Sequence, residues 1–375
     1  MSDISSLSGL RVLDLSRVLA GPLCTMMLGD MGADVIKAER VGTGDETRGW
    51  GPPFDGRGES SYFLSINRNK KSLAVDFDRP EDRALLDQLA AEADVVVENF
   101  LPGALERRGL GADNLRDRHP RLVWCTITGF GAGSTRPGYD VVVQAERGWM
   151  AITGESDGRP MRAGVAIADV LAGKDACAAI LAALLKRDRT GQGAHVTISL
   201  ADSAAAALLN VAQSALVTGS DAKRWGNAHP NLVPYQLFDA ADRPIVVAVG
   251  SDAQWARFAE ALELRELAAD PELSSNEGRV RQRSRVVSAV AARLAERPAA
   301  MWIALLSDAA VPCGVVKGVL EALEEVECSP LTGIAPSLPG SVRLPPPLLD
   351  EHGEEIRRLG WATFRPAREV RPLAL

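Results

Sequence analysis

A lone acidic residue in an apolar segment is the first candidate for chemistry in this 375-residue chain. Asp169 lies in the segment AGVAIADVLAG, residues 163–173, whose other members are all apolar or glycine. Burying a carboxylate without partners is costly, so such a group is paired, held neutral or poised for reaction. A structural interpretation is also open: Asp169 caps a helix that begins near Gly173, since aspartate is a favoured helix N-cap.

Basic residues form a second group of candidates. Arg40 directly follows the segment VIKAE, and Arg107 follows Asn99 on a predicted short helix, while others precede a third predicted strand (Arg68, Lys70 and Lys71). Planar guanidinium groups bind phosphate through paired hydrogen bonds. Any one of these residues also fits a solvated face. Their shared position at one predicted sheet edge favours a site for an anionic small molecule.

The other reactive residue types are not arranged for other chemistry. The four histidines are far apart, and the five cysteines form no CxxC pair or Cys/His cluster, so we expect no metal site. The cysteines are odd in number and widely spaced, which indicates free thiols in a reducing compartment. No GxSxG motif is present, and no GxGxxG fingerprint follows the first predicted strand. These absences argue against a serine hydrolase and against dinucleotide binding.

Composition narrows the class of partner. The formal net charge is −7 and no long run of lysine or arginine occurs, so nucleic acid is not an expected partner. The N-terminal segment MSDISSLSGL lacks the basic and apolar regions of a signal peptide, and the apolar run Ala176–Leu185 is too short to span a membrane. We therefore expect a cytoplasmic protein with no membrane partner.

The elements that must position these residues alternate between strands and helices. Helices are predicted over Glu81–Ala91 and from the segment Pro102–Arg108 onward. The strands are predicted at five places: Leu10–Leu15, Asp34–Glu39, Leu73–Phe77, Asp94–Glu98 and Leu122–Thr128. This alternation predicts an α/β fold with a mainly parallel, doubly wound sheet. Ligands bind beyond the carboxyl ends of the strands in such sheets, which is where Asn99 is expected.

The second half of the chain predicts a further, smaller α/β domain. A small-residue helix is predicted from Gly173 to about Arg187, then a strand over Ala194–Leu200 and a helix over Ala201–Val217; a later helix is predicted over Arg279–Ala295. The predicted divisions are a large domain over residues 1–218 completed by 345–375, a linker at 219–232, a small domain at 233–328 and a return linker at 329–347.

Taken in order, these segments resemble the family III CoA-transferases, the group that contains formyl-CoA and carnitine CoA-transferases. The similar segments include LRVLDLSRVLAGP, MGADVIKAER, ADVVVENFLPGALERRGLG and GVAIADVLAG, within a set that spans roughly residues 7–360. The resemblance implies a Rossmann-like large domain, a second, smaller α/β domain and an interlocked homodimer.

The resemblance also implies a mechanism. Asp169 is expected to attack an acyl-CoA thioester and form a mixed anhydride. CoA thiolate then returns to give an aspartyl-CoA thioester, which activates a free carboxylic acid in turn. This is nucleophilic catalysis by a carboxylate, without a metal. The segment HPNLVPYQ is most similar to members that act on dicarboxylates, with succinyl-CoA as an expected donor.

Coenzyme A contacts are implied by motif position. Arg40 and Arg107 are expected at the nucleotide phosphates, and Val75 and Asn99 at the nucleotide or pantetheine. The backbone of Val18, Leu19 and Ala20 is expected to line the thioester end. Some relatives carry glutamine where this chain has Leu19, so that polar group is missing here.

Two other functions stay open. The α-methylacyl-CoA racemases share the fold but use a histidine in a GHD motif, and here that motif is Gly138-Tyr139-Asp140. Tyrosine, with a reference pKa near 10, is a poor base near neutral pH, so transfer is favoured over racemisation. The other alternative is a non-catalytic CoA-binding protein, which the presence of Asp169 disfavours.

Overall fold

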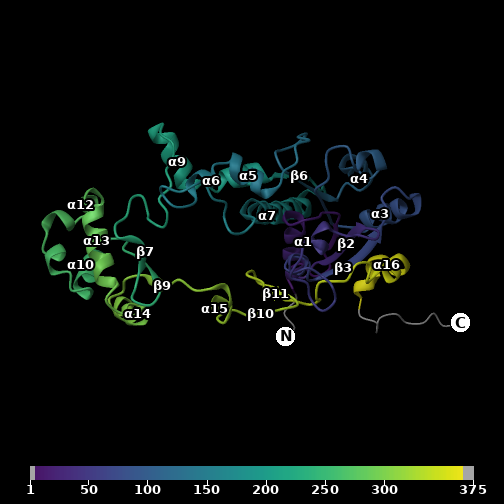
Figure 1. The fold of residues 1–375 in the computed structure, drawn as a ribbon. Helices are drawn as coiled ribbons and strands as arrows, with labels where there is room; N and C mark the ends of the chain where they lie inside the picture. Colours follow the sequence, from purple (N-terminus) through teal and green to yellow (C-terminus); the bar gives the residue numbers. More distant parts are fainter. Residues whose placement is uncertain (1–4, 366–375) are drawn as a thin grey trace. The chain divides into compact units, whose positions relative to one another are not determined.

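The structure is a computed structural model that describes residues 5–365. Two compact units divide the chain. The first combines the chain up to Met150, Arg162–Gly219 and the chain from Val326 onward, and the second combines Ala151–Met161 with Ser220–Glu325. Figure 1 traces both units along the sequence.

A six-stranded parallel sheet forms the centre of the first unit. Its spatial order, β3-β2-β1-β4-β5-β6, is that of a Rossmann-type sheet. The topological switch point, where the strand order reverses, lies between β1 and β4. The strands are β1 (Arg11–Asp14), β2 (Asp34–Arg40), β3 (Lys70–Val75), β4 (Val95–Glu98), β5 (Val123–Thr128) and β6 (His195–Ser199). The predicted parallel α/β sheet is confirmed, although β3 begins and ends earlier than the predicted strand Leu73–Phe77.

Successive residues of the central strands face two separate cores, because side chains alternate across a sheet. Val12 of β1 packs in the core under α1 (Ala20–Asp30) and α7 (Ile167–Thr190), whereas Leu13 packs in the core on the other face. That second face is covered by α3 (Pro80–Glu92), α4 (Ala112–Arg118) and α16 (Gly353–Leu359). The first unit therefore has three layers.

The remaining elements of the first unit are short. They are α2 (Ser61–Leu64), α5 (Asp140–Glu146), α6 (Trp149–Ile152, which reaches into the second unit), α8 (Leu200–Ala206), α9 (Leu209–Thr218), β10 (Cys328–Ser329), β11 (Gly333–Ile334) and the 3-10 turns η1 (Glu46–Gly49), η2 (Glu106–Arg108) and η4 (Gly360–Phe364). The helix predicted from Pro102–Arg108 is only the turn η2.

Several predicted helices begin or break elsewhere. The helix predicted over Ala201–Val217 is two helices, α8 and α9, which meet at 72°. The helix predicted over Arg279–Ala295 is likewise split, into α12 and α13. The helix predicted from Gly173 begins at Ile167, so Asp169 lies inside its first turn.

The second unit has its own core. A three-stranded antiparallel sheet, β7-β8-β9, packs against helices whose buried residues include Trp255, Phe258 and Trp302. Its elements are β7 (Tyr235–Asp239), β8 (Pro244–Ala248), α10 (Asp252–Ala261), α11 (Arg265–Ala268), η3 (Pro271–Leu273), α12 (Asn276–Arg281), α13 (Arg283–Leu294), α14 (Ala299–Asp308), β9 (Cys313–Val315) and α15 (Val319–Leu323).

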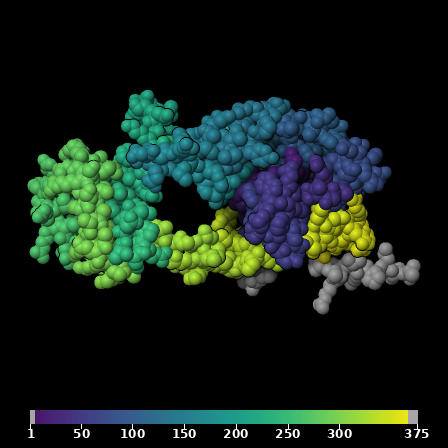
Figure 2. Space-filling model, in the orientation of Figure 1, coloured from purple at the N-terminus to yellow at the C-terminus, as the bar shows by residue number. Residues whose placement is uncertain are grey.

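The C-terminal segment returns to the first unit and is tied to β3. The buried Asn69 amide oxygen accepts hydrogen bonds from the backbone N–H groups of Arg343 (2.6 Å) and Leu344 (2.9 Å). Arg68 forms an ion pair with Asp30 at 2.7 Å and donates to the Thr332 carbonyl. Figure 2 shows this C-terminal part, in yellow, packed beside the purple N-terminal part of the same unit.

Candidate functional site

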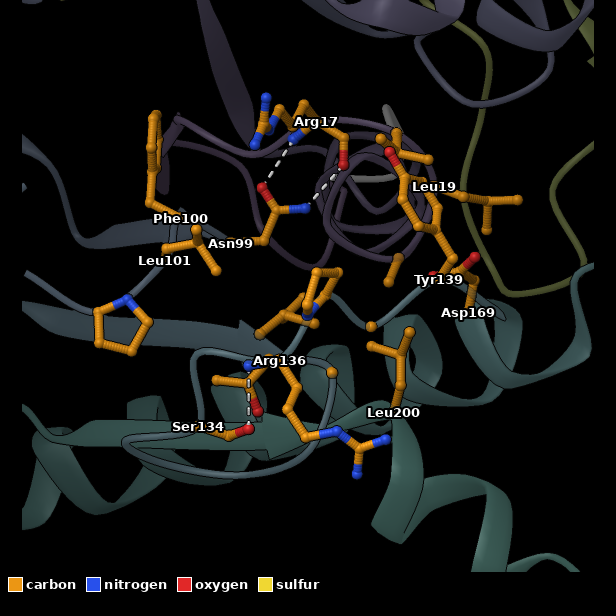
Figure 3. Close-up of a pocket in the computed structure, with 18 of the residues that line it drawn as sticks. Arg17, Leu19, Asn99, Phe100, Leu101, Ser134, Arg136, Tyr139, Asp169 and Leu200 are labelled. Carbon is orange, nitrogen blue, oxygen red and sulfur yellow. Dashed lines mark hydrogen bonds between the residues drawn. The ribbon is translucent and has the colours of Figure 1, made fainter. Parts of the chain in front are cut away.

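A cavity of about 220 Å³ lies at the carboxyl ends of the parallel strands. Its walls come from the turn after β1, the segment after β4, the loop after β5 and the first residue of α8, which follows β6. Figure 3 shows Asp169 and Tyr139 on one side of this pocket and Phe100 and Leu101 on the other. The position matches the edge at which a doubly wound sheet binds its ligand.

Asp169 is the third residue of α7, whose N-cap is Ala166. The capping interpretation of Asp169 is therefore wrong. The cap hydrogen bond comes instead from Asp140, whose Oδ1 accepts from the backbone N–H of Ala168 at 2.8 Å. This arrangement leaves the Asp169 carboxylate free of a capping role, in the wall of the pocket.

The surroundings of Asp169 favour its neutral form. In residues 5–365, no hydrogen bond or ion pair to the Asp169 carboxylate is formed by another side chain or by the backbone. Burial, and secondarily the negative charge of Asp140, raise the pKa of Asp169 to about 7. The start of α7 acts the other way, because a helix N-terminus stabilises a nearby anion by roughly 0.3–1 kcal/mol. Near neutral pH the carboxylate is thus weakly solvated and has no fixed cation.

Asp140 and Gln144 fix the segment that leads into α7. Gln144 donates from Nε2 to Asp140 Oδ2 at 2.7 Å and accepts at Oε1 from the Ala163 N–H at 2.8 Å. Asp140 is the first residue of α5, so it ties the starts of α5 and α7 together. Both side chains are buried, and their hydrogen bonds fix the start of α7, which carries Asp169.

Tyr62 is a neighbour that the sequence interpretation did not identify. Burial, followed by the charges of Asp169 and Asp140, raises the pKa of Tyr62 to about 12. The Tyr62 ring packs edge-on against Trp50, with ring centroids 5.2 Å apart. The Tyr62 hydroxyl therefore stays protonated near neutral pH, and it lies within the electrostatic influence of Asp169 and Asp140. No spacing in the sequence links residue 62 to residue 169, so only the fold reveals this contact.

Asn99 lies in the pocket as predicted, but its amide is already engaged. Asn99 Oδ1 accepts from the Arg17 N–H at 3.1 Å, and Nδ2 donates to the Arg17 carbonyl at 2.8 Å (Figure 3). Asn99 therefore clamps the turn that contains Val18, Leu19 and Ala20, all of which line the pocket. Asn99 thus contributes to the pocket by fixing the conformation of this turn.

Arginine side chains at the pocket carry positive charge. Arg17 lines the cavity, forms an ion pair with Glu46 at 2.6 Å and lies over the Phe100 ring. Arg136 also lines it, pairs with Glu146 at 2.6 Å and lies 4.0 Å from the Phe130 ring centroid. Neither arginine was among the predicted contacts.

The other predicted contacts fall in different places. Arg40 is exposed and lines a second cavity of about 110 Å³, which shares Arg17 and Phe100 with the first. Arg107 is exposed on η2, outside both cavities. Within the described range, neither Arg40 nor Arg107 has an ion-pair partner.

The side chain of Val75 does not reach the ligand edge of the sheet. Its side chain is fully buried in the core beneath α3, and its carbonyl accepts a hydrogen bond from the Val41 N–H. The strand ends at this residue, so the accessible positions begin beyond it. A side chain packed in the core is not available to a nucleotide.

Metal and membrane features are absent from the part of the chain that the structure describes. Between residues 5 and 365 there is no group of three or more His, Cys, Asp or Glu side chains placed to hold a metal ion. Within the same range no single helix is long and apolar enough to cross a membrane; α8 and α9 reach that length only together, across their bend.

Comparison with known proteins gives one consistent result. The sequence model of CoA-transferase family III matches residues 7–333. The succinyl-CoA:glutarate CoA-transferase of Mus musculus is 42% identical, over 93% of this chain and 85% of that protein. The succinyl-CoA:mesaconate CoA-transferase of Haloarcula hispanica is also 42% identical, over 71% of this chain and 70% of that protein. A crystal structure of a CAIB/BAIF family protein from Brucella suis superposes with a TM-score of 0.85 at 37% identity, covering 94% of this chain and 99% of that one.

Proposed function

This chain belongs to CoA-transferase family III, and we propose that it transfers CoA through a covalent intermediate on Asp169. The enzyme moves CoA from an acyl-CoA donor to a free carboxylic acid. The observation that carries the proposal is the placement of Asp169 in the wall of the cavity at the carboxyl ends of the strands, with no partner for its carboxylate among residues 5–365.

The chemistry proceeds by two exchanges at carbonyl carbons. A carboxylate oxygen of Asp169 attacks the thioester carbonyl carbon, the C–S bond breaks, and a mixed anhydride and CoA thiolate result. The thiolate then attacks the Asp169 carbonyl carbon and releases the donor acid, which leaves an aspartyl-CoA thioester. The acceptor carboxylate repeats the sequence in reverse and departs as the new acyl-CoA. Weak solvation of Asp169 favours the first attack, because fewer water hydrogen bonds must be given up.

We propose that CoA runs along the two cavities, which share lining residues. We propose that Arg40 and Arg107 bind the nucleotide phosphates, supported by their exposure and by the lack of an ion-pair partner for either within residues 5–365. The chain of CoA then follows the second cavity past Arg17 and Phe100, which both cavities share. The thioester end meets the backbone of Val18, Leu19 and Ala20, opposite Asp169.

We propose a dicarboxylate acceptor with succinyl-CoA as donor. Support comes from the similar enzymes, whose names give succinyl-CoA with glutarate or mesaconate. Arg17 and Arg136 line the pocket, and their guanidinium groups are donors for a second carboxylate in addition to their glutamate partners.

The acceptor proposal is tested by competition between matched acids. With succinyl-CoA as donor, kcat/KM for glutarate and for mesaconate is expected to exceed that for butyrate at least about tenfold, because butyrate lacks the second charged group. Equal rates for butyrate would remove the dicarboxylate assignment and leave CoA transfer standing.

We further propose that the enzyme is a cytoplasmic homodimer. None of the five cysteines forms a disulfide within residues 5–365, in keeping with a reducing compartment. Helix α9 has no buried residue and exposes Leu209, Leu216 and Val217, an apolar face suited to a second copy. Light scattering after size exclusion is expected to give twice the 39.9 kDa chain mass, whereas a monomer would contradict the assignment.

A further inference from the structure

Val18 has a backbone conformation that is sterically unfavourable for a valine side chain. Its φ angle is +71°, in the left-handed region, where β-branched residues are rare and strained at a cost of order 1–3 kcal/mol. The residue lies in the turn between β1 and α1 and lines the pocket with Asp169. Surrounding contacts must therefore impose this conformation.

Asp45 supplies the most direct of these contacts. Both oxygens of its carboxylate accept from the Val18 N–H, each at 3.2 Å. Asp45 is not part of the turn and does not line the Asp169 cavity; it precedes η1, 27 residues further along the chain. A hydrogen bond to a charged acceptor is stronger than one to a neutral acceptor, which suits a bond that must hold a strained residue.

Lys37 and Thr47 fix Asp45 in turn. Lys37 Nζ lies 3.0 Å from Asp45 Oδ2, and neither side chain is exposed to solvent. Thr47 donates to Asp45 Oδ1 from its backbone N–H at 3.0 Å and from its hydroxyl at 2.8 Å. Burial opposes the ionisation of Asp45, but the Lys37 charge and the Thr47 hydrogen bonds outweigh it and lower the Asp45 pKa.

Lys37 also holds the turn on its other side. Its ammonium donates to the Ser16 carbonyl at 2.8 Å, two residues before Val18. The buried ion pair of Lys37 and Asp45 therefore binds two backbone groups of the same turn. Lys37 binds the Ser16 carbonyl, and Asp45 binds the Val18 N–H.

We propose that Asp45, locked by Lys37, is a positioning residue for CoA transfer. It holds Val18 in the left-handed conformation and so sets the wall of backbone that faces the Asp169 carboxylate. The inference rests on the proposed role of Asp169 and adds residues that do not themselves touch the reacting atoms. Misplacement of a reacting group by about 1 Å can cost 10²-fold in rate.

The test compares Asp45→Asn with a matched buried carboxylate. Asp45→Asn keeps the shape and removes the charge that pairs with Lys37. Its control is Glu59→Gln: Glu59 is also buried and ion-paired, with Arg48 at 2.6 Å, but it makes no contact with the turn. The rate of acyl-CoA-dependent labelling of Asp169 at saturating donor is measured for both, together with thermal unfolding.

Asp45 lines the second cavity but not the cavity that holds Asp169. We therefore expect Asp45→Asn to lower the labelling rate at saturating donor about 10²-fold, a much larger factor than any change in the half-saturating donor concentration. Glu59→Gln is expected to lose comparable thermal stability and to keep its rate within about twofold. A normal rate in folded Asp45→Asn, or an equal loss in Glu59→Gln, would overturn the positioning role.

A milder variant covers the case in which Asp45→Asn does not fold. Thr47→Val removes one of the hydrogen bonds that orient Asp45 and is expected to slow labelling in the same direction by a smaller factor. An unchanged rate in Thr47→Val would count against the proposal. Absence of any label in the unmodified enzyme would instead refute the covalent function, so the two failures are distinguishable.

Discussion

At the scale of single residues, the ionisation of Asp169 links reactivity to stability. Burial and the charge of Asp140 raise its pKa to about 7, well above the ordinary value of an aspartate near 3.8. The folded state thus binds the Asp169 proton more tightly than the unfolded state does. The resulting stabilisation of the folded state is complete at pH values below the Asp169 pKa of the unfolded state. It is lost as pH rises through the Asp169 pKa of the folded state.

Because stability falls as Asp169 ionises, a prediction follows for Asp169→Asn, whose side chain cannot ionise. Relative to the unmodified enzyme, the variant is expected to gain about 3 kcal/mol of unfolding free energy between pH 5 and pH 8, because the Asp169 pKa of about 7 lies two units above pH 5 and each unit is worth 1.36 kcal/mol. Denaturant unfolding of both proteins at the two pH values measures the difference. A stability difference that is the same at pH 5 and pH 8 would show that the Asp169 pKa is not raised.

The same ionisation predicts how the rate depends on pH. Only the carboxylate attacks, so labelling of Asp169 by acyl-CoA is expected to rise with pH up to about 7 and then level off. At pH 5 the rate is expected to be about 10²-fold below the plateau. Single-turnover labelling across this range is the measurement, and a flat profile between pH 5 and 8 is the contrary result.

At the scale of elements, the site depends on the close approach of α1 and α7. A Cβ atom on Gly173 of α7 would lie 2.7 Å from the carbonyl oxygen of Ala20, the first residue of α1. Glycine therefore lets the first turn of α7, which carries Asp169, lie against the turn that lines the pocket. The backbone atom that a side chain would meet cannot move aside without shifting α1.

Gly173→Ala is accordingly expected to separate the two helix starts. The strain is expected to lower the free energy of unfolding by about 1–3 kcal/mol and to reduce kcat more than KM for the acyl-CoA. Gly56→Ala is the control, because a Cβ there meets nothing within 4 Å. Equal behaviour of the two variants in unfolding and in kcat would show that the helix contact does not set the site.

At the scale of the whole molecule, the chain leaves the sheet for a second unit and then returns to the sheet. The return segment is held on β3 by Asn69, which accepts from the Arg343 and Leu344 N–H groups and donates to the Ser341 carbonyl at 2.9 Å. These bonds join positions more than 270 residues apart, so they link the two ends of the first unit.

Removal of this link is expected to loosen the return segment. Asn69→Ala leaves the partly buried N–H groups of Arg343 and Leu344 without their acceptor, and each lost hydrogen bond costs about 1 kcal/mol. We expect a lower unfolding midpoint and faster proteolysis near residues 341–344, with exposed Asn114→Ala as the control. Unchanged proteolysis in Asn69→Ala would show that other contacts hold the segment.

Much of this arrangement was predictable because local sequence determined it. The buried strands, their parallel order and the mismatch of Asp169 with its apolar segment were all recognisable from residue types. The sequence places the start of α7 too late, because Gly173 is typical of a helix boundary, whereas in the structure it allows the close approach to Ala20. The bend between α8 and α9 occurs at Leu209, with φ +42° and no glycine or proline to signal it.

Other site residues could not be predicted from the sequence for a different reason. Tyr62, Asp140 and Arg17 reach the site through tertiary contacts that no sequence spacing encodes. Val75 ends its strand at the ligand edge, but its side chain points into the core because the strand register faces it toward α3.

The central claim is that Asp169 carries CoA covalently, and one measurement tests it most directly. Intact-mass spectrometry of the enzyme mixed with succinyl-CoA, followed by peptide mapping, is predicted to find a hydroxylamine-sensitive CoA adduct on Asp169 that is absent from Asp169→Ala. Transfer to glutarate without any adduct, or an adduct on another residue that persists in Asp169→Ala, would contradict the account.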